Sequence, residues 1–411
     1  MLLGELVERE QAGQPIQVGL IGAGAMGKGI ALQIGKTPGM ELSFIADTDP
    51  QAANVAKGAY GKDVATYNDA SRALDDEKIP LDVLVEATNS IGPAAGYSLE
   101  AIARGAHVVL MNAEVDLVVG PLLQHKASEQ DVIVTSDAGD QHGVLARMID
   151  EIALWGFDIT QAGNIKGFLD RYATAASKAE IAKQLGLSIT QCVAYTDGTK
   201  LNVEMALIGN GANLTPTQDG MEGPRAENVS EALTLFNFDT YGDQGKIDYL
   251  LGAQPGGGVY VIGSNNDPVQ AEYLDYYKVQ NKEGRYLFYR PYHLCHIETP
   301  RAIARAALWG KAVLQPRHGQ LNDAKQDLNT GALITHGIGG DQTYGLVSEN
   351  TSDLSDRLPV GLLESESGST EHARTRRKIA KDEPLYWGDI EIPQTKLLDL
   401  YQRQSELLNP R

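Results

Sequence analysis

Short apolar runs alternate with longer amphipathic stretches through the first 150 residues of the chain. Apolar runs bounded by turn residues indicate buried strands, and apolar positions three or four apart indicate helices. Strands and helices that alternate in this way predict parallel βαβ units with right-handed crossovers. The predicted strands are 18–21, 42–46, 81–88, 105–111 and 131–136, and the clearest predicted helices are 94–104 and 119–129.

The first apolar run breaks into the glycine pattern Gly22-x-Gly24-x-x-Gly27, and Asp47 follows twenty positions after the last glycine. The first glycine allows a sharp turn, the second allows close approach of a pyrophosphate, and the third allows close packing of the next helix. The helix N-terminus then faces the phosphates. This order predicts a dinucleotide site that also includes Ala25 and Met26.

Other residues that follow predicted strands complete the expected cofactor site, because ligands of such sheets bind at the carboxyl ends of the strands. Asp47 ends the second strand, where its carboxylate is placed to accept hydrogen bonds from a ribose hydroxyl. Thr88 and Asn112 follow later strands. Asp47 and Asp49 would repel a 2′-phosphate, and the nearest downstream cation is Lys57. Local charge therefore favours NAD over NADP.

The pattern changes after about residue 150, where strands mix with helices and long loops. Strands are predicted at 158–164, 188–195 and 259–262, and helices at 199–208, 298–310 and 393–408. From about residue 314 the chain is rich in Gly, Thr, Ser and Asp, which indicates short strands. We expect an α/β protein with a Rossmann-type parallel sheet domain (1–152), an α+β substrate domain (153–313) and a small β-rich domain (314–411). Helix 298–310 is expected to pack back on the first domain.

Composition narrows the class of partner. The net charge of −19 and a pI of about 4.8 argue against nucleic acid and anionic membrane surfaces. The first residues lack the pattern of a signal peptide, and no apolar run is long enough to span a bilayer. Two cysteines without zinc-site spacing fit a reducing compartment. We expect a cytoplasmic homo-oligomer that acts on a small molecule.

Several stretches together resemble the homoserine dehydrogenase-like oxidoreductases that carry a C-terminal SAF (antifreeze-like) domain, including the 1-deoxy-D-xylulose 5-phosphate reductoisomerase-like enzymes. The resemblance implies an NAD(P)-dependent oxidoreductase and leans toward NADP, and residues 379–390 resemble the closing strand and turn of a SAF domain. The stretches that carry it are 15–47, Gly139-Asp140-Gln141, Asp197-Gly198-Thr199-Lys200 and Tyr289-Arg290-Pro291-Tyr292-His293-Leu294.

One position departs from the family pattern. Homoserine dehydrogenases typically place a lysine soon after the fifth strand, in an Ala-Asn-Lys context. The matching stretch here is Met111-Asn112-Ala113-Glu114, so that Glu114 stands where a cation is expected. The departure argues against plain homoserine oxidation and favours the reductoisomerase-like interpretation.

Hydride transfer at a carbonyl also needs a group that exchanges the hydroxyl proton. Lys200 is the first candidate, because Glu204 is its i,i+4 neighbour on the predicted helix and Asp197 lies just before the first turn. A lysine held between two carboxylates can orient a substrate oxygen and supply its proton. The alternative is a solvated helical ion pair.

The segment 290–298 is the second candidate. Arg290 can bind a phosphate or carboxylate with its planar guanidinium, and His293 or His296 can relay a proton. Alternatively, Tyr292 and His296 pack a domain interface while Glu298 caps the following helix.

Four further residues complete the predicted substrate site. Asp140 and Gln141 follow the sixth strand and offer hydrogen bonds to hydroxyls, whereas Lys166 offers a cation and Glu114 a carboxylate. Each has an ordinary structural alternative, such as a helix cap or a surface charge. Glu114, Asp116 and Asp140 together offer hard oxygen ligands to a divalent cation, although their spacing does not identify a metal site.

The sequence therefore predicts an NAD(P)-dependent oxidoreductase that acts on a small, polyhydroxylated, anionic substrate, with a reductoisomerase as the specific candidate. Two alternatives remain open. The first is an isomerase, epimerase or lyase that retains its cofactor and performs no net redox reaction. The second is a nucleotide-sensing regulatory protein.

Overall fold

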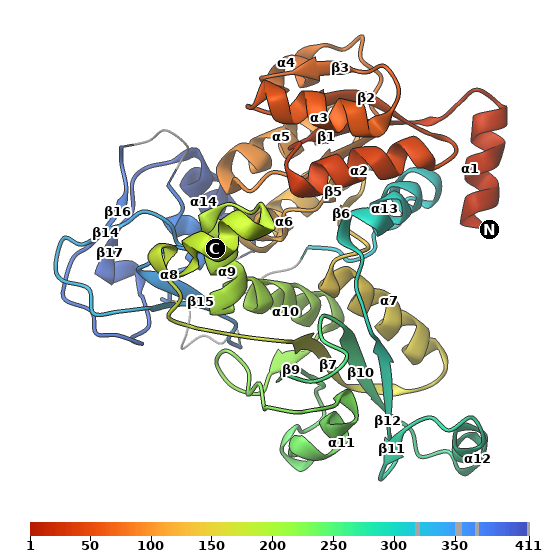
Figure 1. Cartoon of the computed structure of the whole chain (residues 1–411), viewed down its shortest axis with the longest axis vertical. Helices are drawn as coiled ribbons and strands as arrows, with labels where there is room; N and C mark the ends of the chain where they lie inside the picture. The colour runs from red at the N-terminus through yellow and green to blue at the C-terminus, as the bar shows by residue number, and fades with distance from the viewer. Residues whose placement is uncertain (317–320, 350–355, 366–369, 409–411) are drawn as a thin grey trace. The chain divides into compact units, whose positions relative to one another are not determined.

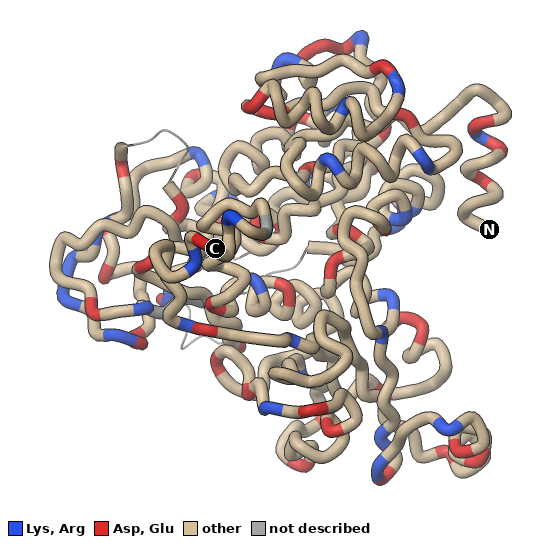
Figure 2. Tube along the Cα trace, viewed as in Figure 1, with Lys and Arg blue, Asp and Glu red and all other residues tan. Residues whose placement is uncertain are grey.

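The computed structural model describes the chain except for residues 317–320, 350–355, 366–369 and 409–411 (Figure 1). The chain divides into two compact units. Unit 1 comprises residues 1–140, 294–317 and 394–411, and unit 2 comprises residues 141–293 and 318–393. Lys and Arg are interspersed with Asp and Glu along the trace of each unit (Figure 2). No helix among the described residues is long and apolar enough to cross a membrane.

Unit 1 is built on a six-stranded parallel sheet with the order β3-β2-β1-β4-β5-β6. The order in which successive strands are added to the sheet reverses at β1, which pairs with both β2 and β4. This arrangement confirms the predicted Rossmann-type sheet. The strands are β1 (Ile16–Ile21), β2 (Met40–Ala46), β3 (Ala65–Tyr67), β4 (Val83–Glu86), β5 (His107–Leu110) and β6 (Val134–Ser136).

Helices cover this sheet, and two of them come from distant parts of the chain. α13 packs on α2, and its Ala302, Ile303 and Ala304 join the core around β1. α14 packs on α6 and α5. The helices of unit 1 are α1 (Leu2–Gln11), α2 (Ala25–Lys36), α3 (Pro50–Tyr60), α4 (Ala70–Asp75), α5 (Ile91–Ala103), α6 (Ala113–Glu129), α13 (Cys295–Trp309) and α14 (Lys396–Leu408).

α14 is joined to α6 by one amide side chain. Pro121 lies inside α6, where a proline ring disturbs the regular hydrogen bonds of the preceding turn. Gln404 of α14 accepts a hydrogen bond from the Leu122 N–H over 3.0 Å and donates to the Val118 carbonyl over 2.9 Å. These backbone groups are four residues apart and would pair with each other in a regular helix. The buried Gln404 amide thus provides hydrogen-bond partners for the two backbone groups of the interrupted turn.

Unit 2 contains a mixed sheet with the order β11-β12-β10-β7-β9-β8. Its strands are β7 (Asp158–Lys166), β8 (Thr215–Pro216), β9 (Lys246–Leu251), β10 (Val259–Ser264), β11 (Asn281–Lys282) and β12 (Arg285–Arg290). α7 and α10 pack on β7. A separate apolar core includes Tyr260 of β10 and the segment from Val229 to Tyr241. The helices are α7 (Gln141–Leu154), α8 (Ala175–Leu185), α9 (Ile189–Asp197), α10 (Thr199–Ala212), α11 (Ala232–Leu235) and α12 (Pro268–Tyr276).

The strand predicted at 188–195 is wrong, because this segment forms α9. Ser188 caps the helix by accepting a hydrogen bond from the Gln191 N–H, and Gly198 ends it in the left-handed conformation. The β-branched Ile189, Thr190 and Val193 suggested a strand, but these local cap signals and the packing of α9 on α8 outweigh that preference.

The C-terminal part of unit 2 contains two small antiparallel sheets, which confirms the expected β-rich region. One pairs β13 (Leu321–Ala324) with β15 (Thr343–Leu346), and the other has the order β14-β16-β17. The strands of this second small sheet are β14 (Leu333–Ile334), β16 (Ala373–Thr375) and β17 (Ile390–Glu391). The division into three domains and the assignment of a SAF domain stay predictions.

Glu86, Asp116 and Asp137 are among the buried carboxyl groups of unit 1, and each is at most 1% exposed. Burial raises the pKa of each to about 7, because removal from water disfavours the charged form. Asp116 Oδ2 accepts a hydrogen bond from Ser136 Oγ over 2.8 Å. Its Oδ1 makes no hydrogen bond to the described residues. The folded protein therefore retains a proton on Asp116 at pH values where the unfolded chain has lost it.

We expect Asp116→Asn to stabilise the protein above pH 7. Because the folded pKa lies above the unfolded value, wild-type stability falls as the pH rises from about 4 to about 7. The neutral amide removes this loss in the free energy of unfolding. The loss is on the order of a few kcal/mol, since each unit of pKa difference between the folded and unfolded states corresponds to about 1.4 kcal/mol. Urea unfolding from pH 4 to pH 8 measures the difference, with the exposed Asp75→Asn as a control. An equal difference between wild type and variant at every pH would contradict the prediction.

Candidate active site

The glycine turn after β1 has the local geometry that a dinucleotide needs. Gly22 has a φ of +91°, and a Cβ there would lie 2.5 Å from the Ala87 carbonyl carbon. A Cβ on Gly27 would lie 1.8 Å from the Gly22 carbonyl oxygen, so only glycine permits α2 to begin so close to the turn. By contrast, a Cβ on Gly24 would meet nothing within 4 Å. The open space at Gly24, beside the N-terminus of α2, fits a pyrophosphate.

Asp47 is tied to this turn. Its Oδ2 accepts a hydrogen bond from the Ala23 N–H over 2.6 Å, and its Oδ1 accepts from the Asp49 N–H over 2.8 Å. The carboxylate is therefore held beside the glycine turn, as the sequence predicts for a ribose-binding acid. Asp49 caps α3 by accepting from the Gln51 N–H.

The ends of β4 and β5 hold the other predicted cofactor residues. Glu86 Oε1 accepts from the Thr88 N–H over 2.9 Å, and Asn112 Nδ2 donates to the Ser90 carbonyl over 3.3 Å. The charge of Glu114, in the first turn of α6, adds to the raised pKa of Glu86. Sequence analysis overlooked Glu86, although a carboxylate at the end of an apolar strand was a visible signal.

A buried polar network lies in unit 2 between β7 and α10. Asn164 Nδ2 donates to Glu204 Oε2 over 3.3 Å. With its amide nitrogen turned toward Glu204, Gln141 at the start of α7 donates to Glu204 Oε1 over 3.0 Å and accepts from Asn164 Nδ2 over 3.1 Å. α7, β7 and α10 thus contribute one side chain each. The structure brings together two of the residues that the sequence singles out, Gln141 and Glu204.

Lys166 ends β7 on the same face as Asn164, because strand side chains alternate. It is only 3% exposed, and its Nζ lies 3.6 Å from the centroid of the Tyr195 ring. Burial and the charge of Glu204 raise the pKa of Tyr195. Tyr195, which sequence analysis overlooked within its predicted strand, therefore belongs to the neighbourhood of Lys166 and Glu204.

Asp197 ends α9, and Lys200 lies at the start of α10. Lys200 is in the first turn, and Glu204 follows one turn later on the same side. The Asp197 carboxylate caps α10 by accepting from the Thr199 N–H over 2.8 Å, and it pairs with the ammonium group of Lys325. Pairing of Asp197 with Lys325 could not be anticipated from the sequence.

The residues of the 290–298 segment divide between the two units. Arg290 ends β12, and its guanidinium carbon lies 4.7 Å from the Tyr292 ring centroid. The strand register aligns Arg290 with Val259 and Val259 with Asn164, which places Arg290 about 10 Å from Asn164 along one sheet face. His293 Nδ1 lies 2.7 Å from the Gly257 carbonyl oxygen.

The other residues of this segment belong to unit 1. A Cβ on Gly29 of α2 would lie 2.4 Å from His296 Cδ2, so His296 packs closely on α2. Burial lowers the pKa of His296. Cys295 Sγ lies 3.8 Å from Asp140 Oδ1, and the backbone N–H of Asp140 donates to the buried Asp137.

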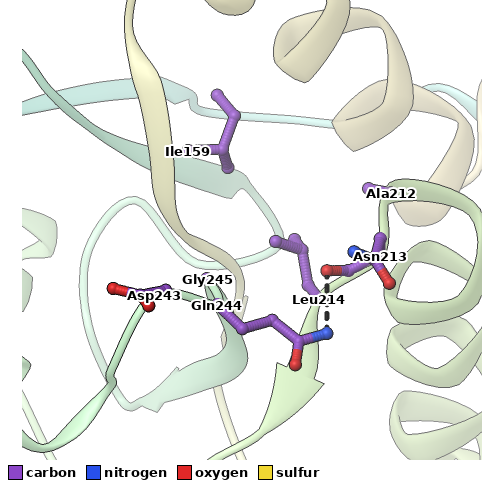
Figure 3. Close-up of a pocket in the computed structure, with 7 residues that line it drawn as sticks. All are labelled: Ile159, Ala212, Asn213, Leu214, Asp243, Gln244 and Gly245. Carbon is purple, nitrogen blue, oxygen red and sulfur yellow. Dashed lines mark hydrogen bonds between the residues drawn. The ribbon is translucent and has the colours of Figure 1, made fainter.

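A separate hollow of about 540 Å³ lies at the other end of β7 (Figure 3). Seven residues line it, from Ile159 near the start of β7 to the Asp243–Gly245 loop. Ile159 and Lys166 are seven residues apart on one strand, which corresponds to about 23 Å. This hollow is therefore distant from the network around Glu204.

Two family models match consecutive parts of the chain. Residues 22–135 match the NAD-binding domain of homoserine dehydrogenase, and residues 139–299 match the catalytic domain of "Oxidoreductase DRL". The chain is an NAD(P)-dependent oxidoreductase. The first match contains the glycine turn, and the second contains Asn164, Lys166 and Glu204.

The solved structures that match the chain do so at low sequence identity and low TM-score. GenD2 from gentamicin A biosynthesis is 14% identical, with a TM-score of 0.41 over 72% of this chain and 87% of its own. A probable dehydrogenase from Thermotoga maritima is 12% identical, with a TM-score of 0.42 over 72% and 90%. A myo-inositol dehydrogenase from Lactobacillus casei is 17% identical, with a TM-score of 0.39 over 61% and 71%. No curated protein matches the chain.

We expect Gly24→Val to weaken binding of the nicotinamide cofactor at least tenfold, about 1.4 kcal/mol, because the new side chain fills the space beside α2. Its Cβ meets no neighbour, so Tm should change little. NADH fluorescence titration measures the affinity, and Gly58→Val, on an equally open position of α3, is the matched control. Unchanged NADH affinity in Gly24→Val would show that the cofactor does not approach this turn.

Proposed function

We propose that this oxidoreductase transfers hydride between a nicotinamide cofactor and a carbonyl or hydroxyl carbon of a small, polyhydroxylated, anionic substrate. The network of Gln141, Asn164 and Glu204 carries the proposal, together with Lys166 on β7 and Lys200 on α10. It lies within the segment that matches an oxidoreductase catalytic domain. The homo-oligomer and the cytoplasmic location stay predictions.

The proposed cofactor site is the turn Gly22–Gly27 with Asp47, Thr88 and Asn112. The cofactor supplies or accepts the hydride. The protein must supply the matching proton, since a carbonyl oxygen that becomes a hydroxyl gains one. The local fit supports this assignment: Gly24 leaves space for a pyrophosphate, and Asp47 is held at the turn.

Lys200 is the proposed proton donor in the direction of reduction. Its ammonium group transfers a proton to the developing alkoxide, and the amine takes the proton back in the direction of oxidation. Glu204, one helical turn away, keeps a negative charge near Lys200 and favours the ammonium form. Gln141 and Asn164 hold the Glu204 carboxylate, which is 8% exposed.

Lys166 and Arg290 are the proposed anion-binding residues. A buried ammonium is poorly hydrated and gains from an anionic ligand, and Lys166 lies at the end of β7 beside Glu204's network. Arg290 shares its sheet face and presents a planar set of donors suited to phosphate. His293, held by the Gly257 carbonyl, is a further proposed substrate contact.

Reductive isomerisation of a sugar phosphate is the specific reaction that we propose to test first. The family resemblance and the cationic residues above support it. The carboxylates that the sequence offers to a divalent cation do not fit an exchangeable metal well, because Asp116 is 1% exposed and accepts from Ser136. We therefore derive no metal-dependent step from Glu114, Asp116 and Asp140.

We expect Lys200→Met and Lys166→Met to separate the two roles. Loss of the proton donor should lower kcat by about a hundredfold or more with little change in KM, whereas loss of the anion-binding lysine should mainly raise KM. Steady-state assays with 1-deoxy-D-xylulose 5-phosphate, and with a panel of sugar phosphates and 2-hydroxy acids, measure both.

The exposed Lys183→Met is the matched control for these assays. NADH titration of each variant checks that the cofactor site is intact. If Lys200→Met retained the wild-type kcat, the proton would come from another group. If wild type turned over no member of the panel, the proposed substrate class would be wrong.

We propose NAD as the preferred cofactor and expect NADH to bind more tightly than NADPH, because Asp47 and Asp49 repel a 2′-phosphate. Asp47→Asn keeps an oxygen that accepts from the Ala23 N–H but removes one charge. It should narrow the NADH-to-NADPH affinity ratio several-fold. Calorimetric titration of both cofactors measures the ratio, and Asp69→Asn, at the cap of α4, controls for charge alone. Tighter NADPH binding by wild type would contradict the charge argument.

A further inference from the structure

Lys325, which follows β13, is buried against the start of α10. Its side chain is 2% exposed. Its Nζ donates to the Ala173 carbonyl over 2.9 Å, the Gly340 carbonyl over 2.8 Å and Asp197 Oδ2 over 2.8 Å. A lysine ammonium has three donors, and all three are used here.

Asp197 transmits this contact to α10. The same carboxylate accepts the Thr199 N–H at the first residue of α10, across Gly198 with its φ of +90°. Burial raises the pKa of Asp197, and the positive charge of Lys325 opposes that rise. A buried carboxylate that loses its cation is strongly destabilised, so Lys325 and Asp197 act as a pair.

β15 and the residue that follows it make two further contacts with the first turn of α10. The Gly345 N–H donates to Thr199 Oγ1 over 3.0 Å, and the Val347 N–H donates to Asn202 Oδ1 over 2.9 Å. Asn202 also donates to the Gly198 carbonyl. Residues 325–347 therefore contact Asp197 at the end of α9 and Thr199 and Asn202 in the first turn of α10.

We propose that Lys325 is a positioning residue for the active site, and that residues 325–347 orient the turn of α10 that carries Lys200 and Glu204. Lys200 lies between Thr199 and Asn202, which accept hydrogen bonds from the backbone N–H groups of Gly345 and Val347. Glu204 follows Asn202 by two positions on the same rigid helix. A displacement of about 1 Å at a reacting group can cost about a hundredfold in rate, so such support matters for turnover.

The proposal rests on the proposed function, since it assigns the proton transfer to Lys200 and Glu204. A test that does not depend on turnover is therefore needed beside the kinetic one. The charge of Glu204 contributes to the raised pKa of Tyr195, so the Tyr195 phenol reports the position of Glu204. Incorporation of 3-fluorotyrosine at position 195 of the full chain makes this titration visible by fluorine NMR.

We expect Lys325→Met to lower the titration midpoint of fluorotyrosine 195, and to lower kcat about a hundredfold while NADH affinity is retained. The double variant Asp197→Asn with Lys325→Met removes the unpaired buried charge. It should recover much of the lost Tm but not the wild-type kcat or titration midpoint, because the contact that orients α10 is still absent.

Lys178→Met is the matched control, because Lys178 is also a buried lysine paired with a carboxylate, Asp170, but it lies on α8 and its ion pair does not include a residue of α10. It should leave the titration of fluorotyrosine 195 unchanged. If the double variant regained both the wild-type midpoint and kcat together with Tm, Lys325 would serve stability alone and the proposal would be wrong. Absence of turnover in wild type would overturn the proposed function, whereas the NMR titration would still decide whether Lys325 positions Glu204.

Discussion

A polar group that is buried in a protein costs free energy unless it finds a partner there, and the arrangement of the candidate active site follows from that constraint. Glu204 is buried against β7, so its carboxylate needs donors, which Asn164 and Gln141 provide. Asp197 is buried at the start of α10 and obtains the ammonium group of Lys325. The same requirement in unit 1 brings Gln404 into the turn of α6 that Pro121 disturbs.

The sequence predicts the dinucleotide-binding part well because each of its signals is local. Gly22, Gly24 and Gly27 differ in what a Cβ would meet, and these differences match the separate roles that the spacing predicts. The order of strands and helices through residue 136 also leaves few alternatives to a parallel sheet. Asp47 lies at its predicted place because it ends a strand adjacent to the glycine turn.

The second unit is harder to predict, because its important contacts join residues that are distant in sequence. Asn164 and Arg290 share a face only through the pairing of β7, β10 and β12, which local patterns do not specify. Lys325 lies 128 positions from Asp197, so the spacing suggested Lys200 as the partner of that carboxylate instead. In segment 188–195 a local pattern was misleading instead. Its β-branched residues suggested a strand, whereas the Ser188 cap and packing on α8 select a helix.

Cofactor binding and the choice of reaction depend on different residues. The proposed dinucleotide site at the glycine turn and Asp47 is compatible with a cofactor that is consumed and with one that is regenerated in each turnover. The roles that we propose for Lys200, Glu204 and Lys166 are proton transfer and anion binding, and Glu114 stands where a homoserine dehydrogenase typically has a lysine. The specific reaction therefore depends on the second unit.

The most direct measurement is the fate of the transferred hydrogen. The full chain is incubated with NADH that carries deuterium at the transferable position and with a sugar phosphate that it turns over, and the product is examined by NMR and mass spectrometry. The account predicts one deuterium on the carbon that becomes the alcohol, with stoichiometric NAD formed. Product that forms without deuterium and without oxidation of NADH would contradict net hydride transfer.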